Sequence, residues 1–99
     1  MLVINGVITI DPSRRADLVA AAIAMQTASQ AEPGCHHYVF STDLERTDVF
    51  HLAEKWEDQA ALDVHFATPA MAAFQKSIAG AVTAMSATKY EIASEGPIR

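Results

Sequence analysis

His65 is the residue in this 99-residue chain whose type best suits acid–base chemistry. It follows Ala61 by one helical turn, so a helix here would place it at the edge of the side that meets a sheet. A neutral imidazole beside an apolar cavity can accept a proton near neutral pH, because the pKa of an imidazole moves easily with its surroundings. The alternative is a half-buried structural histidine whose ring is bonded to a backbone carbonyl.

Two aromatic residues, Trp56 and Tyr38, are candidates for the walls of a site around such a base. Their N–H and O–H groups can each donate a hydrogen bond to a substrate oxygen, while the rings cover apolar surface. Packing under a helix is the simpler alternative for the tryptophan. The remaining candidates for substrate contact are one histidine and four apolar residues: His36, Phe40, Leu52, Phe66 and Phe74.

The four histidines form no pattern typical of a metal centre. His36 and His37 are neighbours that would point to opposite faces of a strand, so one ion could not easily bind both. His51 adds no HxH or HxxxH spacing. No glycine-rich phosphate loop is present, so we expect neither a metal nor a nucleotide or flavin cofactor. The one cysteine, Cys35, is expected to be a free structural thiol.

Composition and charge exclude several classes of partner. The net charge is -5, and no block of Lys and Arg exists, which argues against nucleic acid and anionic membranes. No apolar stretch is long enough to span a bilayer, and a single cysteine fits a reducing compartment, so we expect a cytoplasmic protein. Hydrophobic residues make up 51% of the chain, which is high for a small monomer and predicts a homodimer.

The first half of the chain predicts a strand, a helix and a second strand. Residues 2–10 alternate, with the even positions apolar and expected to face helices. A helix that starts at Asp11-Pro12-Ser13 and ends before Pro33 carries an apolar stripe. We expect the strand over 35–41 to place His36, Tyr38 and Phe40 on one face, and the other face to carry Cys35, His37 and Val39. The stripe on the helix consists of Leu18, Ala22, Met25 and Ser29.

The second half predicts a strand, a broken helix and a last strand. The strand over 49–56 presents Phe50, Leu52, Glu54 and Trp56 on one face. A helix over 59–67 is interrupted at Thr68-Pro69, and a further helical segment carries Met71, Phe74, Ile78 and Val82. The last strand is expected over 85–93. The order βαββαβ predicts an α+β, ferredoxin-like fold with an antiparallel sheet, in one domain of residues 1–99 with a tail at 94–99.

Three segments, in their order and spacing, resemble the antibiotic biosynthesis monooxygenase-like family, which includes quinol monooxygenase-like proteins. They are Glu32-Pro33-Gly34-Cys35-His36-His37-Tyr38, Glu54-Lys55-Trp56-Glu57-Asp58 and His65-Phe66-Ala67-Thr68-Pro69. The resemblance implies a dimeric α+β barrel in which two sheets pack face to face. It also implies a cofactor-independent monooxygenase that oxidises a small hydroquinone- or anthrone-like substrate with dioxygen in an apolar pocket. In that mechanism His65 is the base, and Trp56 and Tyr38 position the substrate.

The chain departs from two branches of that family. Gln75 stands where the heme-degrading branch has its histidine ligand, and Leu52 stands where the polyketide branch has an asparagine. One alternative is an isomerase of a small phosphorylated metabolite, which needs cationic ligands such as Lys55, Lys76 or Lys89. Another is a non-catalytic dimer that binds an apolar ligand.

Overall fold

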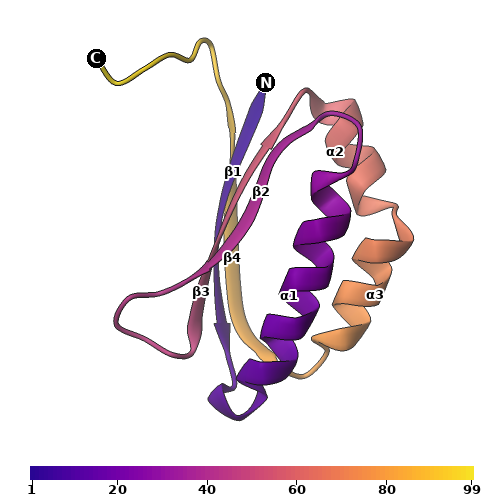
Figure 1. Ribbon diagram of the computed structural model, residues 1–99, viewed down its shortest axis with the longest axis vertical. Coiled ribbons are helices and arrows are strands. Elements are labelled where there is room, and N and C mark those ends of the chain that lie inside the picture. The colour runs from indigo at the N-terminus through magenta and orange to yellow at the C-terminus, as the bar shows by residue number, and fades with distance from the viewer.

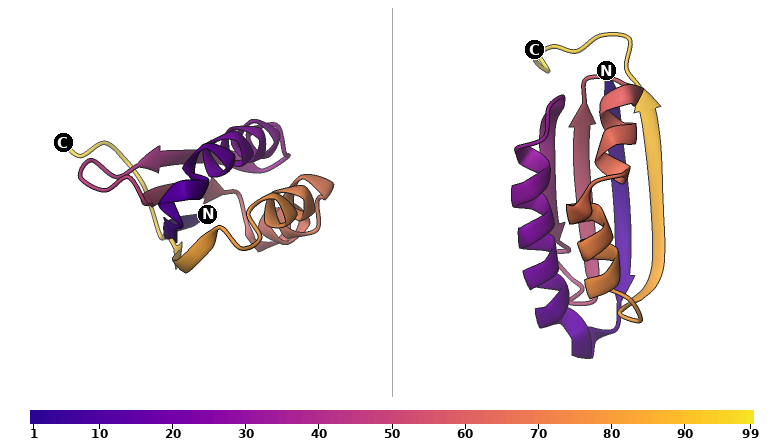
Figure 2. Two further views of the ribbon diagram at one scale, coloured as in Figure 1. Left: turned by 90° about the horizontal axis from the view of Figure 1, so that it is seen from below. Right: turned by 90° about the vertical axis from the view of Figure 1, so that its right-hand side faces the viewer.

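All three α-helices lie on one face of a four-stranded antiparallel sheet in the computed structural model, which describes residues 1–99 (Figure 1, Figure 2). The strand order is β2-β3-β1-β4. This arrangement confirms the predicted α+β, ferredoxin-like fold. The elements in chain order are β1 (Leu2–Ile10), the 3-10 helix η1 (Pro12–Arg14), α1 (Arg15–Gln30), β2 (Cys35–Thr42), β3 (Val49–Trp56), α2 (Gln59–Phe66), α3 (Pro69–Ser77) and β4 (Val82–Glu91).

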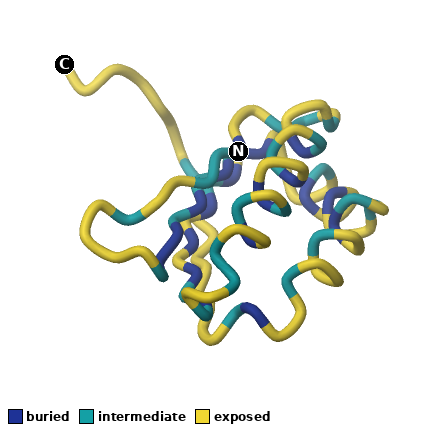
Figure 3. Tube along the Cα trace, turned by 60° about the horizontal axis from the view of Figure 1, so that its bottom comes forward, coloured by how far each residue is buried: buried dark blue, intermediate teal, exposed yellow.

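The core lies between the helices and the covered face of the sheet, as the buried segments in Figure 3 show. Side chains alternate across a strand, and the even positions of β1 are buried while the odd positions are partly or fully exposed. The predicted orientation of this strand is therefore confirmed. The predicted stripe of α1 is also confirmed, since its buried residues are Leu18, Ala22, Met25 and Ser29.

The first helical segment begins where the sequence predicts it. A carboxylate oxygen of Asp11 accepts the backbone N–H of Ser13 at 2.9 Å, and Pro12 takes the first helical position, where a missing N–H costs nothing. At the other end of α1 the chain turns through Gly34, whose φ of 81° favours glycine. This turn brings β2 back beside α1.

The predicted faces of β2 are wrong at its start. The register with β3 shifts between Cys35 and His37, so that Cys35 pairs with Trp56 while His37 pairs with Lys55. A bulge of this kind adds a residue and resets the alternation of side chains. Cys35 therefore packs against the core on the same face as Tyr38, and His36 is exposed.

Two predicted boundaries near the end of the chain are also corrected. Helix α3 ends at Ser77, so Ile78 only caps it and Val82 belongs to β4. Gly80, with a φ of 78°, allows the reversal between them. Strand β4 starts three residues earlier than expected and ends at Glu91.

The two edges of the sheet differ. At the β2 edge, Oε1 of Gln26 accepts the backbone N–H of Phe40 at 2.8 Å, and Nε2 of Gln30 donates to the carbonyl of Tyr38 at 2.9 Å. Strand β4 forms the other edge, and no helix covers it (Figure 2). None of the helices combines the length and the apolar character needed to cross a membrane.

Candidate functional site

Local hydrogen bonds fix the backbone around His65. Helix α2 starts at Asp58, whose side chain accepts the N–H of Ala61 at 2.9 Å. After the helix, the hydroxyl of Thr68 donates to the carbonyl of His65 at 2.8 Å and accepts the N–H of Met71 at 3.2 Å, which starts α3. The carbonyl of His65 therefore holds the side chain of Thr68 at the point where α2 ends and α3 begins.

The ring of His65 is buried and paired with a carboxylate. Its exposed fraction is 1%, so it does not point to solvent. Its Nδ1 atom lies 3.0 Å and 3.2 Å from the two carboxylate oxygens of Glu32, the first residue of the Glu32-Pro33-Gly34 turn. The alternative expected from the sequence, a bond to a backbone carbonyl, is replaced by this bond to an acidic side chain.

Two aromatic rings pack against the imidazole. The ring centroids of Trp56 and Tyr38 lie 4.6 Å and 5.4 Å from that of His65, and both residues are almost wholly buried. The structure therefore brings the three predicted catalytic residues together, from β2, β3 and α2.

The indole N–H of Trp56 is already used within the site. It donates to Oε1 of Glu54 at 2.8 Å, and this glutamate is buried on the helix side of β3. Burial raises the pKa of Glu54, while the bond from Trp56 and the charge of His65 lower it in part. Trp56 can therefore serve as a wall, but its N–H is committed to a carboxyl group.

Tyr38 keeps its proton in this environment. Burial, and to a lesser extent the nearby charge of Glu54, raise the pKa of the Tyr38 phenol far above its ordinary value. A neutral phenol is a hydrogen-bond donor. Of the two donors predicted from the sequence, the indole N–H is committed to a carboxyl group, whereas the hydroxyl of Tyr38 is a neutral donor beside Ser29.

The predicted substrate-contact residues do not stay together. Phe40 lies with its centroid 5.7 Å from that of Tyr38 and 5.7 Å from that of Phe74, so these two extend the row of rings. Leu52 belongs to the same core cluster as Trp56 and Tyr38. Phe66 packs beside the His65 ring but is 58% exposed.

His36 lies outside the group. Because of the bulge in β2 its ring turns outward, where Nε2 lies 2.5 Å from a carboxylate oxygen of Glu57. This exposed pair is separate from the buried residues of the site.

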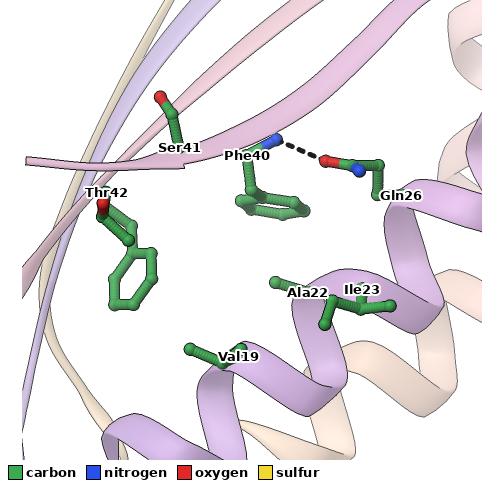
Figure 4. A pocket seen from close by; sticks show the side chains of 8 residues that line it. Val19, Ala22, Ile23, Gln26, Phe40, Ser41 and Thr42 are labelled. Carbon is green, nitrogen blue, oxygen red and sulfur yellow. Dashed lines mark hydrogen bonds between the residues drawn. The ribbon is translucent and has the colours of Figure 1, made fainter.

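A small apolar cavity opens between α1 and the β2 edge (Figure 4). Its volume is about 150 Å³. The ring of Phe40 projects from the strand toward α1 and lines it (Figure 4). The lining residues are Val19, Ala22, Ile23, Gln26, Phe40, Ser41, Thr42 and Phe50. His65 is not among these residues, and the ring of Tyr38 packs against both Phe40 and His65.

A second apolar cavity, of about 120 Å³, lies between α1 and α3 and is lined by Met25 and Phe74 among others. A depression of about 370 Å³ lies on the uncovered face of the sheet and includes Val7, His51 and Tyr90. Neither of them is lined by His65, Trp56 or Tyr38.

Two of the lysines required by the isomerase alternative bond to other side chains. Lys55 pairs with Glu95, and Lys89 donates to the side chain of Gln59 at 2.6 Å, so neither is directed at His65. No three His, Cys, Asp or Glu side chains are grouped in a way that could hold a metal ion.

Sequence reasoning missed the two glutamates of the site. Glu54 carried a usable signal, because it shares the parity of Leu52 and Trp56 on a strand and so had to face the helices. Glu32 carried none, because its contact with His65 joins residues 33 positions apart.

Comparison with known proteins places these features in a family. The family model for antibiotic biosynthesis monooxygenases matches residues 1–77. The "Putative monooxygenase YcnE" of Bacillus subtilis is 30% identical over 65 residues, which cover 66% of this chain and 68% of that protein. The uncharacterized protein sll1783 of Synechocystis sp. is 35% identical over 68 residues, which cover 69% of this chain. The matched part spans 46% of sll1783, about half of that relative.

Solved structures agree over nearly the whole chain. A "putative antibiotic biosynthesis monooxygenase" from Deinococcus radiodurans superposes with a TM-score of 0.91 at 25% identity, and covers 100% of this chain and 99% of its own. The protein PA3566 from Pseudomonas aeruginosa superposes with a TM-score of 0.86 at 27% identity, over 93% of this chain and 94% of its own.

Proposed function

This chain belongs to the antibiotic biosynthesis monooxygenase family, and from that premise we propose that it is a cofactor-independent monooxygenase of a small aromatic substrate. The substrate is a hydroquinone- or anthrone-like molecule, and dioxygen is the oxidant. One observation carries the proposal: the buried imidazole of His65, paired with Glu32, lies in contact with Trp56 and Tyr38. A base held among aromatic rings suits the removal of a proton from an electron-rich phenol.

The reaction balances without a flavin or a metal. His65 takes a phenolic or carbon-bound proton, and the substrate anion passes one electron to dioxygen to give a substrate radical and superoxide. The two radicals combine to a peroxide anion, which takes the proton back from the imidazolium. Loss of water then leaves a carbonyl, so one oxygen atom enters the product and the other leaves as water. Exclusion of bulk water favours recombination of the radicals over escape of superoxide.

Each neighbour of His65 has a role in this scheme. The phenol of Tyr38, held neutral by burial, donates to the oxyanion that develops on the substrate. Trp56 forms an apolar wall, since its N–H bonds to Glu54. Because the rings of Tyr38 and Phe40 lie in series between His65 and the cavity beside α1, one of them must shift to admit the substrate.

The cavity volumes favour a substrate with one aromatic ring. The cavities beside Phe40 and Phe74 measure about 150 Å³ and 120 Å³. Pockets for drug-sized ligands measure roughly 300–1,000 Å³. A single-ring hydroquinone therefore suits this chain better than a three-ring anthrone.

The proposal includes a homodimer formed through the uncovered face of the sheet. Val7 is 40% exposed on that face, and Tyr90 is 50% exposed. Two such sheets packed face to face would bury these residues and give the dimeric barrel that the family resemblance implies.

The test is oxygen uptake by metal-stripped, flavin-free protein with a panel of hydroquinones and anthrones. We expect uptake above the rate of uncatalysed autoxidation, and a fall of roughly 10²–10⁴-fold in His65→Ala, the range typical for loss of a general base. His37→Ala removes an exposed histidine and is the matched control, which should keep the activity.

Uptake equal to autoxidation across the panel would contradict the monooxygenase proposal. Binding of the same compounds without turnover, seen as a change in the fluorescence of the single tryptophan, would then favour a ligand-binding dimer. Turnover of a small phosphorylated metabolite would favour the isomerase alternative.

A further inference from the structure

Glu32 is the charged side chain in hydrogen-bond contact with the His65 ring. The carboxylate oxygens lie 3.0 Å and 3.2 Å from Nδ1, so both face the same nitrogen. The side chain of His65 is 1% exposed and that of Glu32 is 13% exposed. Water therefore competes little for this contact, and the pair is well sequestered.

The chemistry of the two groups places the shared hydrogen on Nδ1 of His65 and not on the carboxylate of Glu32. An ionised carboxylate can only accept hydrogen bonds, whereas a neutral imidazole donates from one nitrogen and accepts at the other. If Nδ1 donates to Glu32, the lone pair of the neutral ring is on Nε2. The partner at one nitrogen thus decides which nitrogen is free to act as a base.

The backbone holds both partners in place. The N–H of Glu32 donates to the carbonyl of Ser29 at 3.0 Å, and the carbonyl of Glu32 accepts the N–H of Cys35 at 3.2 Å. On the other side, the carbonyl of His65 accepts the hydroxyl of Thr68. Both residues are therefore already held in place before the reaction begins. Such prior ordering is the condition for effective positioning.

The turn that carries Glu32 packs closely on the helix that carries His65. A Cβ atom on Gly34 would lie 2.7 Å from Cβ of Ala61, one helical turn before His65. A contact this close requires glycine. The Glu32-Pro33-Gly34 turn is therefore adapted to approach α2, and the hydrogen-bonded Glu32–His65 pair lies at that junction.

We propose that Glu32 is a positioning residue that holds His65 in the tautomer with hydrogen on Nδ1, so that Nε2 is the atom that takes the substrate proton. The catalytic part of this inference rests on the proposed function. The assignment of the tautomer does not, because it concerns the resting protein alone.

The chain contains its own control for this arrangement. His36 and Glu57 form a second His–Glu pair, but the two side chains are 42% and 56% exposed. Water competes with the carboxylate at such a site, and the pair lies outside the row of buried rings. Glu57→Gln is therefore the matched control for Glu32→Gln.

The test is a long-range proton–nitrogen NMR spectrum of uniformly nitrogen-15-labelled protein, at a pH where the imidazoles are neutral. In the wild type we expect His65 to show the shifts of a protonated Nδ1 and a bare Nε2. Glu32→Leu removes the acceptor and should shift the ring toward the other tautomer. Glu32→Gln keeps an acceptor oxygen without the charge and should retain the wild-type tautomer, as should Glu57→Gln.

The kinetic readout uses the best substrate of the oxygen-uptake panel. The outer partners that orient metal-bound histidines typically contribute roughly 10- to 100-fold to activity, and we take the same range for a carboxylate that orients a catalytic imidazole. We expect Glu32→Leu to lower kcat by about that factor with little change in KM, and Glu57→Gln to leave both unchanged.

Two results would overturn the inference. A wild-type spectrum with a bare Nδ1 would overturn it without any variant, whatever the activity. Wild-type shifts in a folded Glu32→Leu would show that Glu32 does not select the tautomer. A wild type that is inactive but has a protonated Nδ1 would support the assignment while removing the catalytic role together with the proposed function.

Discussion

Two glutamates hold the two rings at the centre of the site. Glu32 bonds to Nδ1 of His65, and Glu54 accepts the indole N–H of Trp56 at 2.8 Å. A buried carboxyl group is costly unless it is hydrogen-bonded, so each glutamate is stabilised by the ring that it holds. At the scale of single residues, each glutamate in the site therefore fixes the orientation of one ring and is itself stabilised by that ring.

Glu54 makes the stability of the fold depend on pH. Burial raises its pKa in the folded state above the ordinary value of 4.5, so the folded state binds the proton more tightly than the unfolded chain does. The stabilisation is fully present below pH 4.5 and is lost as the pH rises through the raised pKa. We predict that Glu54→Gln, which still accepts the bond from Trp56, removes this decline.

The measurement is urea unfolding of the wild type and Glu54→Gln from pH 4 to pH 8, monitored by the fluorescence of Trp56. The charges of Glu32 and His65 act on Glu54, so Glu32→Gln is included to separate the contribution of Glu32. A decline of equal size in the wild type and Glu54→Gln would contradict the assignment to Glu54.

The sequence predicts His65, Trp56 and Tyr38 because their types suit chemistry and their spacing matches a family. It does not predict their partners, because acidic residues are mostly exposed in proteins and are assigned to the surface by default. Glu54 is an exception, and the alternation of side chains along β3 predicts it, because Glu54 lies on the same face as Leu52 and Trp56. Glu32 reaches His65 only through the packing of a turn on a helix, which no local pattern encodes.

At the scale of elements, alternation predicts β1 and β3 well and fails at the start of β2. Residues of β1 alternate without interruption, so their faces follow from their type. The register shift between Cys35 and His37 reverses the parity of the residues before it. A bulge depends on pairing with a neighbouring strand, so the sequence of β2 alone could not predict that His36 turns away from the site.

The contact between the Gly34 turn and α2 leads to a prediction about stability. An alanine at position 34 must adopt a φ of 81° and place its Cβ 2.7 Å from Cβ of Ala61. A left-handed conformation alone costs an L-residue roughly 1–2 kcal/mol. We predict that Gly34→Ala lowers the free energy of unfolding by more than that, because the turn must also move away from α2.

Gly80→Ala is the control for this prediction, measured with Gly34→Ala by urea unfolding. Gly80 has a φ of 78°, but no atom lies within 4 Å of the Cβ that alanine would add. The control therefore carries the cost of the backbone conformation without the steric contact. Equal losses in the two variants would mean that the approach of the turn to α2 contributes nothing.

At the scale of the whole molecule, the helices cover one face of the sheet and leave the other open. The open face carries the depression of about 370 Å³, bordered by Val7, His51 and Tyr90. The high hydrophobic content of the chain, 51%, predicts a partner for such a surface. The fold itself followed from the order of the elements, whereas no pattern within the sequence describes what covers the open face.

We predict that the protein forms a dimer in solution and that Val7→Lys weakens it. A lysine at the centre of the open face would have to lose its hydration when two sheets meet, which is costly without a partner charge. Light scattering coupled to size-exclusion chromatography, over a range of protein concentrations, measures the effect as a shift toward monomer.

Leu44→Lys is the matched control, because it introduces the same charge at a fully exposed apolar residue of the β2–β3 loop. It should leave the dimer intact. A wild type that stays monomeric at all concentrations would contradict the dimer, and a dimeric Val7→Lys would place the interface elsewhere.

The glutamine contacts on β2 have a consequence for how many copies can join. Sheets can join edge to edge into a continuous ribbon only if every copy has two open edges, because each copy must pair with one neighbour on either side. Gln26 and Gln30 occupy the N–H of Phe40 and the carbonyl of Tyr38 at the β2 edge, so β4 is the more open of the two edges. Pairing through β4 alone would join two copies and leave no second edge of the same kind, so these two side chains disfavour continuous growth along the sheet.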